Sequence, residues 1–527
     1  MDYSFNLLSE AWIPCITQDD QIKVTNLVTA IQDAHLYKGI QADYPLTTGS
    51  LYLFLLAFSM AIFRPTDDDD WEALYHNGAF PNDTVQRYAE KWKAHFDLFD
   101  EGHPFFQDPK IGLRSKDIEK LKDGKDPEPK GLSGLLLHVA SGSNPTLFDH
   151  SMDDLPISYS PVEAAQLLLM LNAYSLGGLT SASISSDKYY KDSAFSRGIM
   201  FLNRGRSLFE TLMLNMTAVD FYHRHADAPD LPAWERADPF EPERAVPAGP
   251  LDLLTWQSRR IKLLPEISDG QIQVEKCLAA PGFGLVETFT NPYYHLRAEK
   301  DNFDVKNKPM RFLVGKALWR DSAAILDMKA RESDPPLLIQ WFNHLRAEGI
   351  IPNKKIRLEA YGMCTDPGKK KAFFYAQASF TAPAVYLDSE ALLADLKTAI
   401  QYAESVRKSL YFALYELAGY KISPAKDSGE GKDPDKKDIA NLLNYLDAEA
   451  IYWGQLEPAF YSLLLELPAN HSAMTNWKKA LMQSARRSLS EAAEMLGSDA
   501  IALKAKAKAE NRLGFEFTKI PDLIVKE

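Results

Sequence analysis

The stretch "DSEALLADLKTAIQYAESVRKSLYFALYELAG", Asp388 to Gly419, decides how the chain is divided. Its apolar residues recur every three or four positions, which is the period of one face of an α-helix. Asp388 is suited to capping the start of this helix, and Gly419 is suited to its end. We therefore predict a long amphipathic helix whose buried stripe contains Leu392, Leu396, Ile400, Ala403, Leu410, Leu414 and Leu417.

Three further helical patterns follow this stretch, and the connections between them are short. Long helices joined by short connections favour an antiparallel bundle. The patterns lie at residues 439–467, 472–496 and 498–514. We therefore predict a four-helix bundle over residues 384–527.

The chain before Pro383 mixes helical and strand patterns. In "SPVEAAQLLLMLNAY", Ser160 and Glu163 have the spacing of a capping box, and Pro161 suits the first helical turn. The runs "QIQVEK" and "KIRLEAYGM" alternate apolar and polar residues, as strands do. The sequence thus predicts an α+β protein, with a large mixed domain over residues 1–383 followed by the helical bundle.

Composition restricts the classes of protein that this chain can be. The net charge of −13 argues against a protein that coats nucleic acid non-specifically, although it permits contact through a few loops. Three scattered cysteines exclude a disulfide framework and fit a reducing compartment. The apolar run Leu51 to Phe63 is shorter than the roughly 20 residues of a membrane span, so we expect a buried helix. No signal-peptide pattern opens the sequence, and we expect a cytoplasmic protein without a membrane partner.

One short motif is compatible with a metal-dependent enzyme, or else is an exposed polar turn. "HRHAD" contains His223, His225 and Asp227, the beginning of a metallo-hydrolase pattern that continues with another histidine. The chain has Ala228 at that place, so the match stops early. The sequence also lacks a Walker-A motif and a G-x-S-x-G elbow. A metal-dependent hydrolase is therefore kept as the alternative to a non-catalytic protein.

Three loops carry residues suited to contact with a partner. "GSNPTLFDHSMDD", residues 142–154, places an apolar tip in a polar loop. "SLGGLTSASISSDKYYKDS", residues 175–193, opens with two glycines that permit a close backbone approach, or else simply ends a helix. "YGMCTDPGKKKAFFY", residues 361–375, predicts a hairpin with lysines at its tip, which is either a phosphate contact or a solvated turn.

Several segments together resemble the large subunit (CasA) family of the type I-E CRISPR surveillance complex, Cascade. Their order and spacing carry the resemblance, and a helical C-terminus agrees with it. The segments are "FNLLSEAWIP", "DLFDEGHPFFQDP", "NPTLFDH", the glycine pair, "KDSAFSRGIMFLNRGRSLFETLMLNM", "PAWERADP", "LDLLTWQSRRI" and "ALWRDS".

The resemblance implies a non-catalytic antiviral-defence subunit. Some members of the family carry a cysteine-rich metal site, which this chain does not match, so we expect no metal and no cofactor. In that family the subunit binds the end of the crRNA and other Cascade subunits, reads the PAM in double-stranded DNA and assists R-loop formation. Its helical bundle helps to recruit a separate helicase-nuclease. Carried over to this sequence, the crRNA and subunit contacts fall on Asn144, Thr146, Leu147, Phe148, Asp149 and His150.

The same resemblance assigns PAM contacts, with one departure from the family. The family's wedge hairpin often carries a glutamine, whereas the corresponding tip here, Thr365 to Lys371, has Pro367 and lysines. A changed wedge mechanism or a changed PAM preference is therefore expected. The residues implied in DNA binding are Gly177, Gly178, Lys276, Thr365, Asp366, Lys369 and Lys370.

Overall fold

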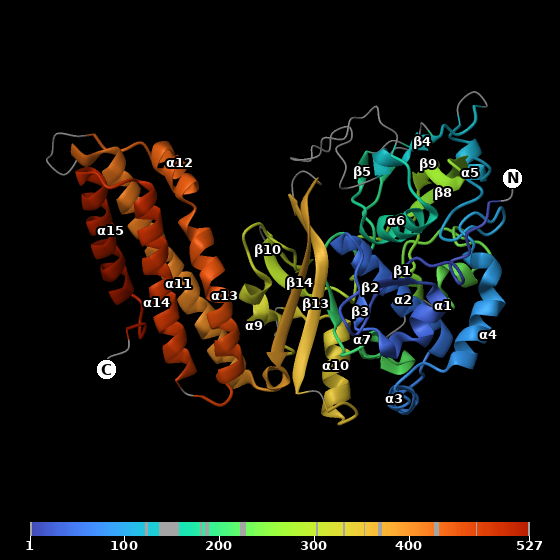
Figure 1. Cartoon of the computed structure of the whole chain (residues 1–527), viewed down its shortest axis with the longest axis horizontal. Helices are drawn as coiled ribbons and strands as arrows, with labels where there is room; N and C mark the ends of the chain where they lie inside the picture. Colours follow the sequence, from blue (N-terminus) through green and yellow to red (C-terminus); the bar gives the residue numbers. More distant parts are fainter. Residues whose placement is uncertain are drawn as a thin grey trace. The chain divides into compact units, whose positions relative to one another are not determined.

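The computed structural model divides the chain into two compact units, each described by itself below (Figure 1). The first contains residues 1–314 and 330–380, and the second contains residues 315–329 and 381–527. The structure describes residues 3–121, 125–135, 157–179, 182–184, 189–221, 228–301, 304–329, 333–352, 354–366, 371–425, 432–470 and 472–524.

Helix α2, Pro45–Phe63, forms the centre of the first unit. It packs against α6 (Pro161–Tyr174), α7 (Leu208–Asn215) and α8 (Pro250–Leu254). Its length and composition are sufficient for a membrane span, but 78% of its apolar window is buried inside the protein. The expected buried helix is thus confirmed, and it begins before Leu51.

The predicted capping box of α6 is present. The Ser160 side chain accepts from the Glu163 backbone N–H, and Glu163 accepts from the Ser160 N–H. The other helices of this unit are α1 (Leu27–Gln32), α3 (Asp68–His76), α4 (Asn82–Trp92), α5 (Ser115–Ile118) and α10 (Leu337–Ala347).

The strands of the first unit form small sheets, and the strand pairs with a described register are antiparallel. Both predicted strand runs are confirmed, in β9 and β13. The sheets have the orders β2-β1-β3, β4-β9-β8, β11-β10-β12, β14-β13-β7 and β5-β6. The bounds are β1 Ile13–Ile16, β2 Ile22–Thr25, β3 Gly39–Ile40, β4 Lys130–Gly131, β5 Gly178–Leu179, β6 Tyr189–Tyr190, β7 Met200–Asn203, β8 Arg259–Ser268, β9 Gln271–Pro281, β10 Leu296–Asp301, β11 Asp304–Pro309, β12 Ser333–Asp334, β13 Lys355–Asp366 and β14 Lys371–Pro383.

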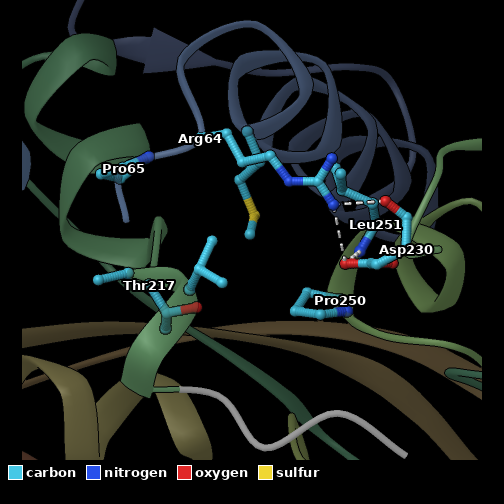
Figure 2. Close-up of a pocket in the computed structure, with 9 residues that line it drawn as sticks. Arg64, Pro65, Thr217, Asp230, Pro250 and Leu251 are labelled. Carbon is cyan, nitrogen blue, oxygen red and sulfur yellow. Dashed lines mark hydrogen bonds and ion pairs between the residues drawn. The ribbon is translucent and has the colours of Figure 1, made fainter. Parts of the chain in front are cut away.

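A proline-rich segment is anchored to the end of α2. Arg64 closes α2 in the left-handed region, with a φ of 40°, and its guanidinium reaches the Asp230 carbonyl and carboxylate (Figure 2). The Asp230 carboxylate accepts from the N–H groups of Leu251 and Asp252 at the start of α8. The cavity beside this pair measures about 30 Å³, room for about one water molecule, and we assign it no function.

The second unit is a helical bundle, so the α+β fold with a C-terminal helical part is confirmed. Helix α11 packs against the others, and the α12–α13 pair occupies the place of one long helix that is broken at Asp447 (Figure 1). The helices are α11 Glu390–Ile422, α12 Lys436–Leu446, α13 Ala448–Glu466, α14 Ala473–Met495 and α15 Ala500–Thr518.

The limits and the buried stripe of α11 differ from the prediction. Ser389 caps the helix by accepting from the Leu392 N–H, and the helix continues past Gly419 to Ile422. Leu392 and Ile400 are only half-buried, because the helix turns Leu393 and Ala399 inward instead. The remaining stripe residues, Leu396, Ala403, Leu410, Leu414 and Leu417, are buried as expected.

The second unit also includes Gly315–Lys329, a segment that precedes α11 by more than sixty residues. This segment contains α9, Ser322–Ile325, and the buried Trp319. The Trp319 ring lies 4.5 Å from the Phe460 ring and 5.8 Å from the Trp453 ring, measured between centroids. The bundle core is therefore completed by a side chain that the helical pattern does not predict.

Candidate nucleic-acid interface

The glycine pair lies just after α6, where β5 pairs with β6 and Gly178 is opposite Tyr190. A side-chain carbon placed on Gly177 would lie 2.7 Å from the Tyr190 carbonyl oxygen and 2.8 Å from the Asp192 nitrogen. Gly177 is thus required by its own chain, and its contact with a groove stays a prediction. Gly178 has a φ of +134° and no described heavy atom within 4 Å of such a carbon, so none of the described residues covers its backbone there.

Two charged side chains fix the path of this turn. Asp192 accepts from the Gly177 N–H at 2.6 Å and from Arg197 Nε at 2.9 Å. Arg259 donates to the Leu176 carbonyl at 3.0 Å and to the Lys191 carbonyl at 2.9 Å. Burial lowers the pKa of Arg259 to about 10, against the opposite effect of Tyr190 and Asp192. At neutral pH its charge is retained and both carbonyls stay bound.

The loop that follows the glycine pair is attached to the strand carrying Lys276. The Ser183 N–H donates to the Ala279 carbonyl at 2.8 Å, and the Ala279 N–H donates to Ser183 Oγ at 2.9 Å. Lys276 lies on the same strand, β9, and its side chain is exposed. Two of the elements predicted to bind DNA are therefore joined through β9.

The stem of the predicted hairpin lies next to the segment that follows the glycine turn. A side-chain carbon on Gly362 in β13 would lie 3.1 Å from the Gly198 carbonyl oxygen, and Arg311 Nε donates to the Arg197 carbonyl at 2.9 Å. The segment from Asp192 to Gly198 thus separates the glycine turn from the hairpin stem. Strand β13 ends at Thr365 and Asp366, whereas Lys369 and Lys370 lie outside the described residues.

The other predicted positions cannot be described. Asn144, Thr146, Leu147, Phe148, Asp149 and His150 lie outside the described residues, as do His223, His225 and Asp227. Within the part of the chain that the structure describes, no group of three or more His, Cys, Asp or Glu side chains is placed to hold a metal ion.

The structure adds Arg197 to the cations that the sequence already shows in this loop. Lys191 and Arg197 are exposed beside the turn, and Lys191 Nζ lies 5.3 Å from the Tyr189 ring centroid. Together with Lys276 they are cations on a chain of net charge −13. Lysine, arginine and an exposed aromatic ring are suited to phosphates and to bases. Arg259 and Asp192 give no local signal, because their roles depend on partners that are distant in sequence.

Comparison with known proteins identifies the family. The model of CRISPR-associated protein Cse1 matches residues 6–488. The CasA/Cse1 protein of Thermus thermophilus is 28% identical over 522 residues, covering 97% of this chain and 96% of the relative.

Solved structures share the fold. Cse1 of Acidimicrobium ferrooxidans has a TM-score of 0.78 at 21% identity, covering 98% of both chains. CasA of Thermus thermophilus has a TM-score of 0.77 at 22% identity, covering 98% of this chain and all of that one. A chain from a structure described as a CRISPR RNA-guided surveillance complex has a TM-score of 0.74 at 20% identity, covering 97% of this chain and 100% of that one.

Proposed function

The chain belongs to the CRISPR-associated Cse1 (CasA) family, and from that premise we propose that it is the non-catalytic large subunit of a crRNA-guided Cascade complex in the cytoplasm. In this role it binds the PAM in double-stranded DNA and helps to open the duplex, while guide pairing reads the target. Its helical bundle helps to recruit the helicase-nuclease. No catalytic step, cofactor or metal is assigned to it.

The observation that carries the proposal is the fixed turn at Gly178. On one side none of the described residues covers its backbone, and on the other side Arg259 and Asp192 hold it through Gly177 and its neighbours. A rigid backbone without a side chain can approach base edges closely. The minor groove presents few distinguishing groups, so a reader of this kind tolerates more than one PAM sequence.

The surrounding cations supply affinity for the duplex. Lys276, Lys191 and Arg197 are exposed and are suited to phosphate contact. Thr365 and Asp366 lead into the hairpin tip, where Lys369 and Lys370 are proposed to contact phosphates during opening. In parallel, the segment from Asn144 to His150, with Phe148 as its apolar anchor, is proposed to bind the crRNA end and the neighbouring subunits.

A substitution at the turn tests the proposal. Gly178→Asp adds a carboxylate where phosphates are expected and should weaken binding of the assembled complex to PAM-bearing duplex by at least tenfold. Gly78→Asp is the matched control, since Gly78 also has a positive φ, +70°, and open space around it. The affinity of the Gly178→Asp variant for a target whose PAM region is already unpaired should fall less. Equal binding by Gly178→Asp and the native chain would exclude the turn from PAM reading.

The hairpin lysines are tested by salt dependence. Lys369→Ala with Lys370→Ala should reduce the slope of log affinity against log salt by up to about two units, because each phosphate contact contributes roughly 0.9. Lys354→Ala with Lys355→Ala is the control, since these exposed lysines lie at the other end of the hairpin stem. An unchanged slope in the tip variant would show that the hairpin tip is a solvated turn without phosphate contacts.

A further inference from the structure

One side of α11, in the second unit, exposes a row of aromatic rings to solvent. Tyr411, Phe412 and Tyr415 are 41%, 45% and 38% exposed, and their spacing puts them on one side of the helix. The Tyr411 ring centroid lies 6.0 Å from that of Phe412 and 6.3 Å from that of Tyr415. Lys408 and Glu416 are exposed at the two ends of this row, and their charges balance. The bundle core is built from the opposite side of α11, so core packing does not explain these rings.

A second row of side chains runs along α15, which packs against α11 (Figure 1). Residues that follow one another at intervals of three or four share one side of a helix. On α15 such a series consists of Lys504, Lys508, Arg512 and Phe515. Phe515 is 55% exposed, so this row also presents an aromatic ring to solvent.

Arg512 joins the two rows into one surface. Its guanidinium carbon lies 5.8 Å from the ring centroid of Phe412 on α11 and 5.9 Å from that of Phe515 on its own helix. Lys519 Nζ lies 4.3 Å from the Phe515 centroid and extends the second row by one helical turn. We call the surface formed by the three α11 rings and the α15 row the α11–α15 face.

The α15 row carries an excess of positive charge. Arg512 and Lys519 both pair with Glu516, at 2.7 and 2.8 Å, so one carboxylate faces two cations. Lys504 is exposed, and among the described residues it forms no ion pair. The whole chain has a net charge of −13, so this local excess is opposite in sign to the charge of the molecule. An anionic partner is therefore favoured at this face.

Exposed rings beside surplus cations suit a single strand of nucleic acid. Aromatic side chains stack on unpaired bases, and cations contact the phosphates, largely independently of the base sequence. A duplex also presents phosphates, but its bases are already stacked on one another, so the rings of this face would gain nothing from it. The combination of rings and cations thus distinguishes a single strand from a duplex.

We propose that the α11–α15 face binds single-stranded DNA. The choice of DNA rests on the function proposed above, because opening a target duplex for guide pairing leaves one DNA strand without its partner. In this proposal the rings of Phe412 and Phe515 stack on bases of that strand. The lysines at the ends of the face contact its phosphates.

Fluorescence anisotropy with the full chain alone tests the proposal. A labelled oligothymidine of about 15 nucleotides should bind saturably at low salt, and an unlabelled duplex of the same length should displace it at least tenfold less well than unlabelled oligothymidine. Equal displacement by the duplex would show that the rings are not used and would overturn the proposal. Tighter binding of an oligouridine of the same length would overturn the choice of DNA.

Phe412→Ala with Phe515→Ala assigns the binding to this face. Both side chains are about half exposed, so the variant should keep the helical circular dichroism of the native chain. Its affinity for oligothymidine should fall at least tenfold, and Phe412→Tyr with Phe515→Tyr should restore it, because tyrosine keeps a stacking ring. Leu465→Ala with Leu503→Ala is the control, since both leucines are exposed on the bundle outside the two rows. Native affinity in the alanine variant at the phenylalanines would overturn the proposal.

Lys408→Gln with Lys504→Gln tests the phosphate contacts. Both lysines are exposed, and among the described residues neither forms an ion pair. The slope of log affinity against log salt should fall by up to about 1.4 units, since each phosphate contact on a single strand contributes roughly 0.7. Lys354→Gln with Lys355→Gln, at exposed lysines of the first unit, is the control. An unchanged slope would overturn the choice of a nucleic acid.

These titrations use no guide, PAM or partner subunit, so their failure can be told apart from failure of the proposed function. If the oligothymidine binds this face while Gly178→Asp leaves PAM binding of the assembled complex unchanged, the proposed function fails alone. If Gly178→Asp weakens PAM binding and no oligothymidine binds at about 100 μM, the weak end of non-specific binding, the α11–α15 face is not a DNA site.

Discussion

Arg259 links carbonyls on both sides of the glycine turn, and this one buried side chain sets the geometry on which the proposed PAM contact depends. Its guanidinium lies 5.0 Å from the centroid of the Tyr190 ring. This cation–π attraction helps to hold the guanidinium against the ring. The turn is therefore held in place before any partner binds, which would lower the entropic cost of the proposed DNA contact.

Arg259→Met should loosen this turn without removing any group that contacts DNA. The Leu176 and Lys191 carbonyls would lose their donor, at a cost of about 1–3 kcal/mol in folding stability. Binding of the assembled complex to PAM-bearing duplex should fall about tenfold, while binding to a target with an unpaired PAM region should change less. Equal losses on both targets would mean that Arg259 serves the fold alone.

Asp238 gives a pH-dependent contribution to stability. Burial opposes its ionisation, but hydrogen bonds from Arg114, the Phe240 N–H and Lys110 prevail and lower its pKa from 3.8 to about 2. A carboxylate with a depressed pKa stabilises the folded state above its unfolded pKa, and this contribution is lost as the pH falls from about 4 to about 2.

Urea unfolding of the native chain and of Asp238→Asn checks this contribution. The native chain should be the more stable of the two at pH 6, and the difference should shrink between about pH 4 and pH 2. A difference that stays constant over this range would show that the carboxylate is not ionised preferentially in the folded state.

At the scale of elements, the sequence predicts what local interactions decide. The capping box of α6 depends on Ser160 and Glu163 alone, so its pattern is visible in the sequence. The end of α11 is not visible in the sequence, because Gly419 can either stop a helix or continue it. Here packing continues the helix to Ile422.

In the candidate site, too, residues with a local signal can be found in the sequence, whereas residues that act through distant partners cannot. Residue type and the family resemblance indicate Gly178 and Lys276. They do not indicate Arg259, because its partners are Leu176 and Lys191, 83 and 68 residues away. For Gly177 the structure adds a requirement that the sequence does not show, since this glycine is needed against its own backbone, a contact that appears only when β5 and β6 are paired.

The break between α12 and α13 offers a test at this scale. Asp447 adopts a φ of 42° and a ψ of 33° and forms no side-chain capping bond to α13. A residue with a side chain is strained in this left-handed conformation, whereas glycine is not. Asp447→Gly should therefore stabilise the bundle by about 0.5–1 kcal/mol in urea unfolding. Asp447→Ala, which keeps the strain, should give no such gain.

At the scale of the whole molecule, the bundle is not a contiguous piece of the chain. Residues 315–329 contribute Trp319, which lies under Trp453 and Phe460, and Arg320, whose Nη2 pairs with Glu404 at 2.5 Å. Removing everything after Pro383 would therefore expose Trp319 on the remaining protein. A loss of DNA degradation in such a truncation would have two causes that the experiment does not separate, namely lost recruitment of the helicase-nuclease and misfolding.

The Trp319→Ala variant measures how much Trp319, which comes from residues 315–329, contributes to the stability of the bundle. Trp319 is 2% exposed and also contacts the Trp477 ring at 6.2 Å between centroids, so its removal leaves a cavity that the helices cannot refill. The free energy of unfolding should fall by about 3–5 kcal/mol. Circular dichroism at helical wavelengths during urea titration is the measurement, and Leu503→Ala, on an exposed part of α15, should change it by less than about 0.5 kcal/mol. If Trp319→Ala unfolds at the native urea concentration, residues 384–527 form a self-sufficient bundle and the simple truncation becomes a valid test of recruitment.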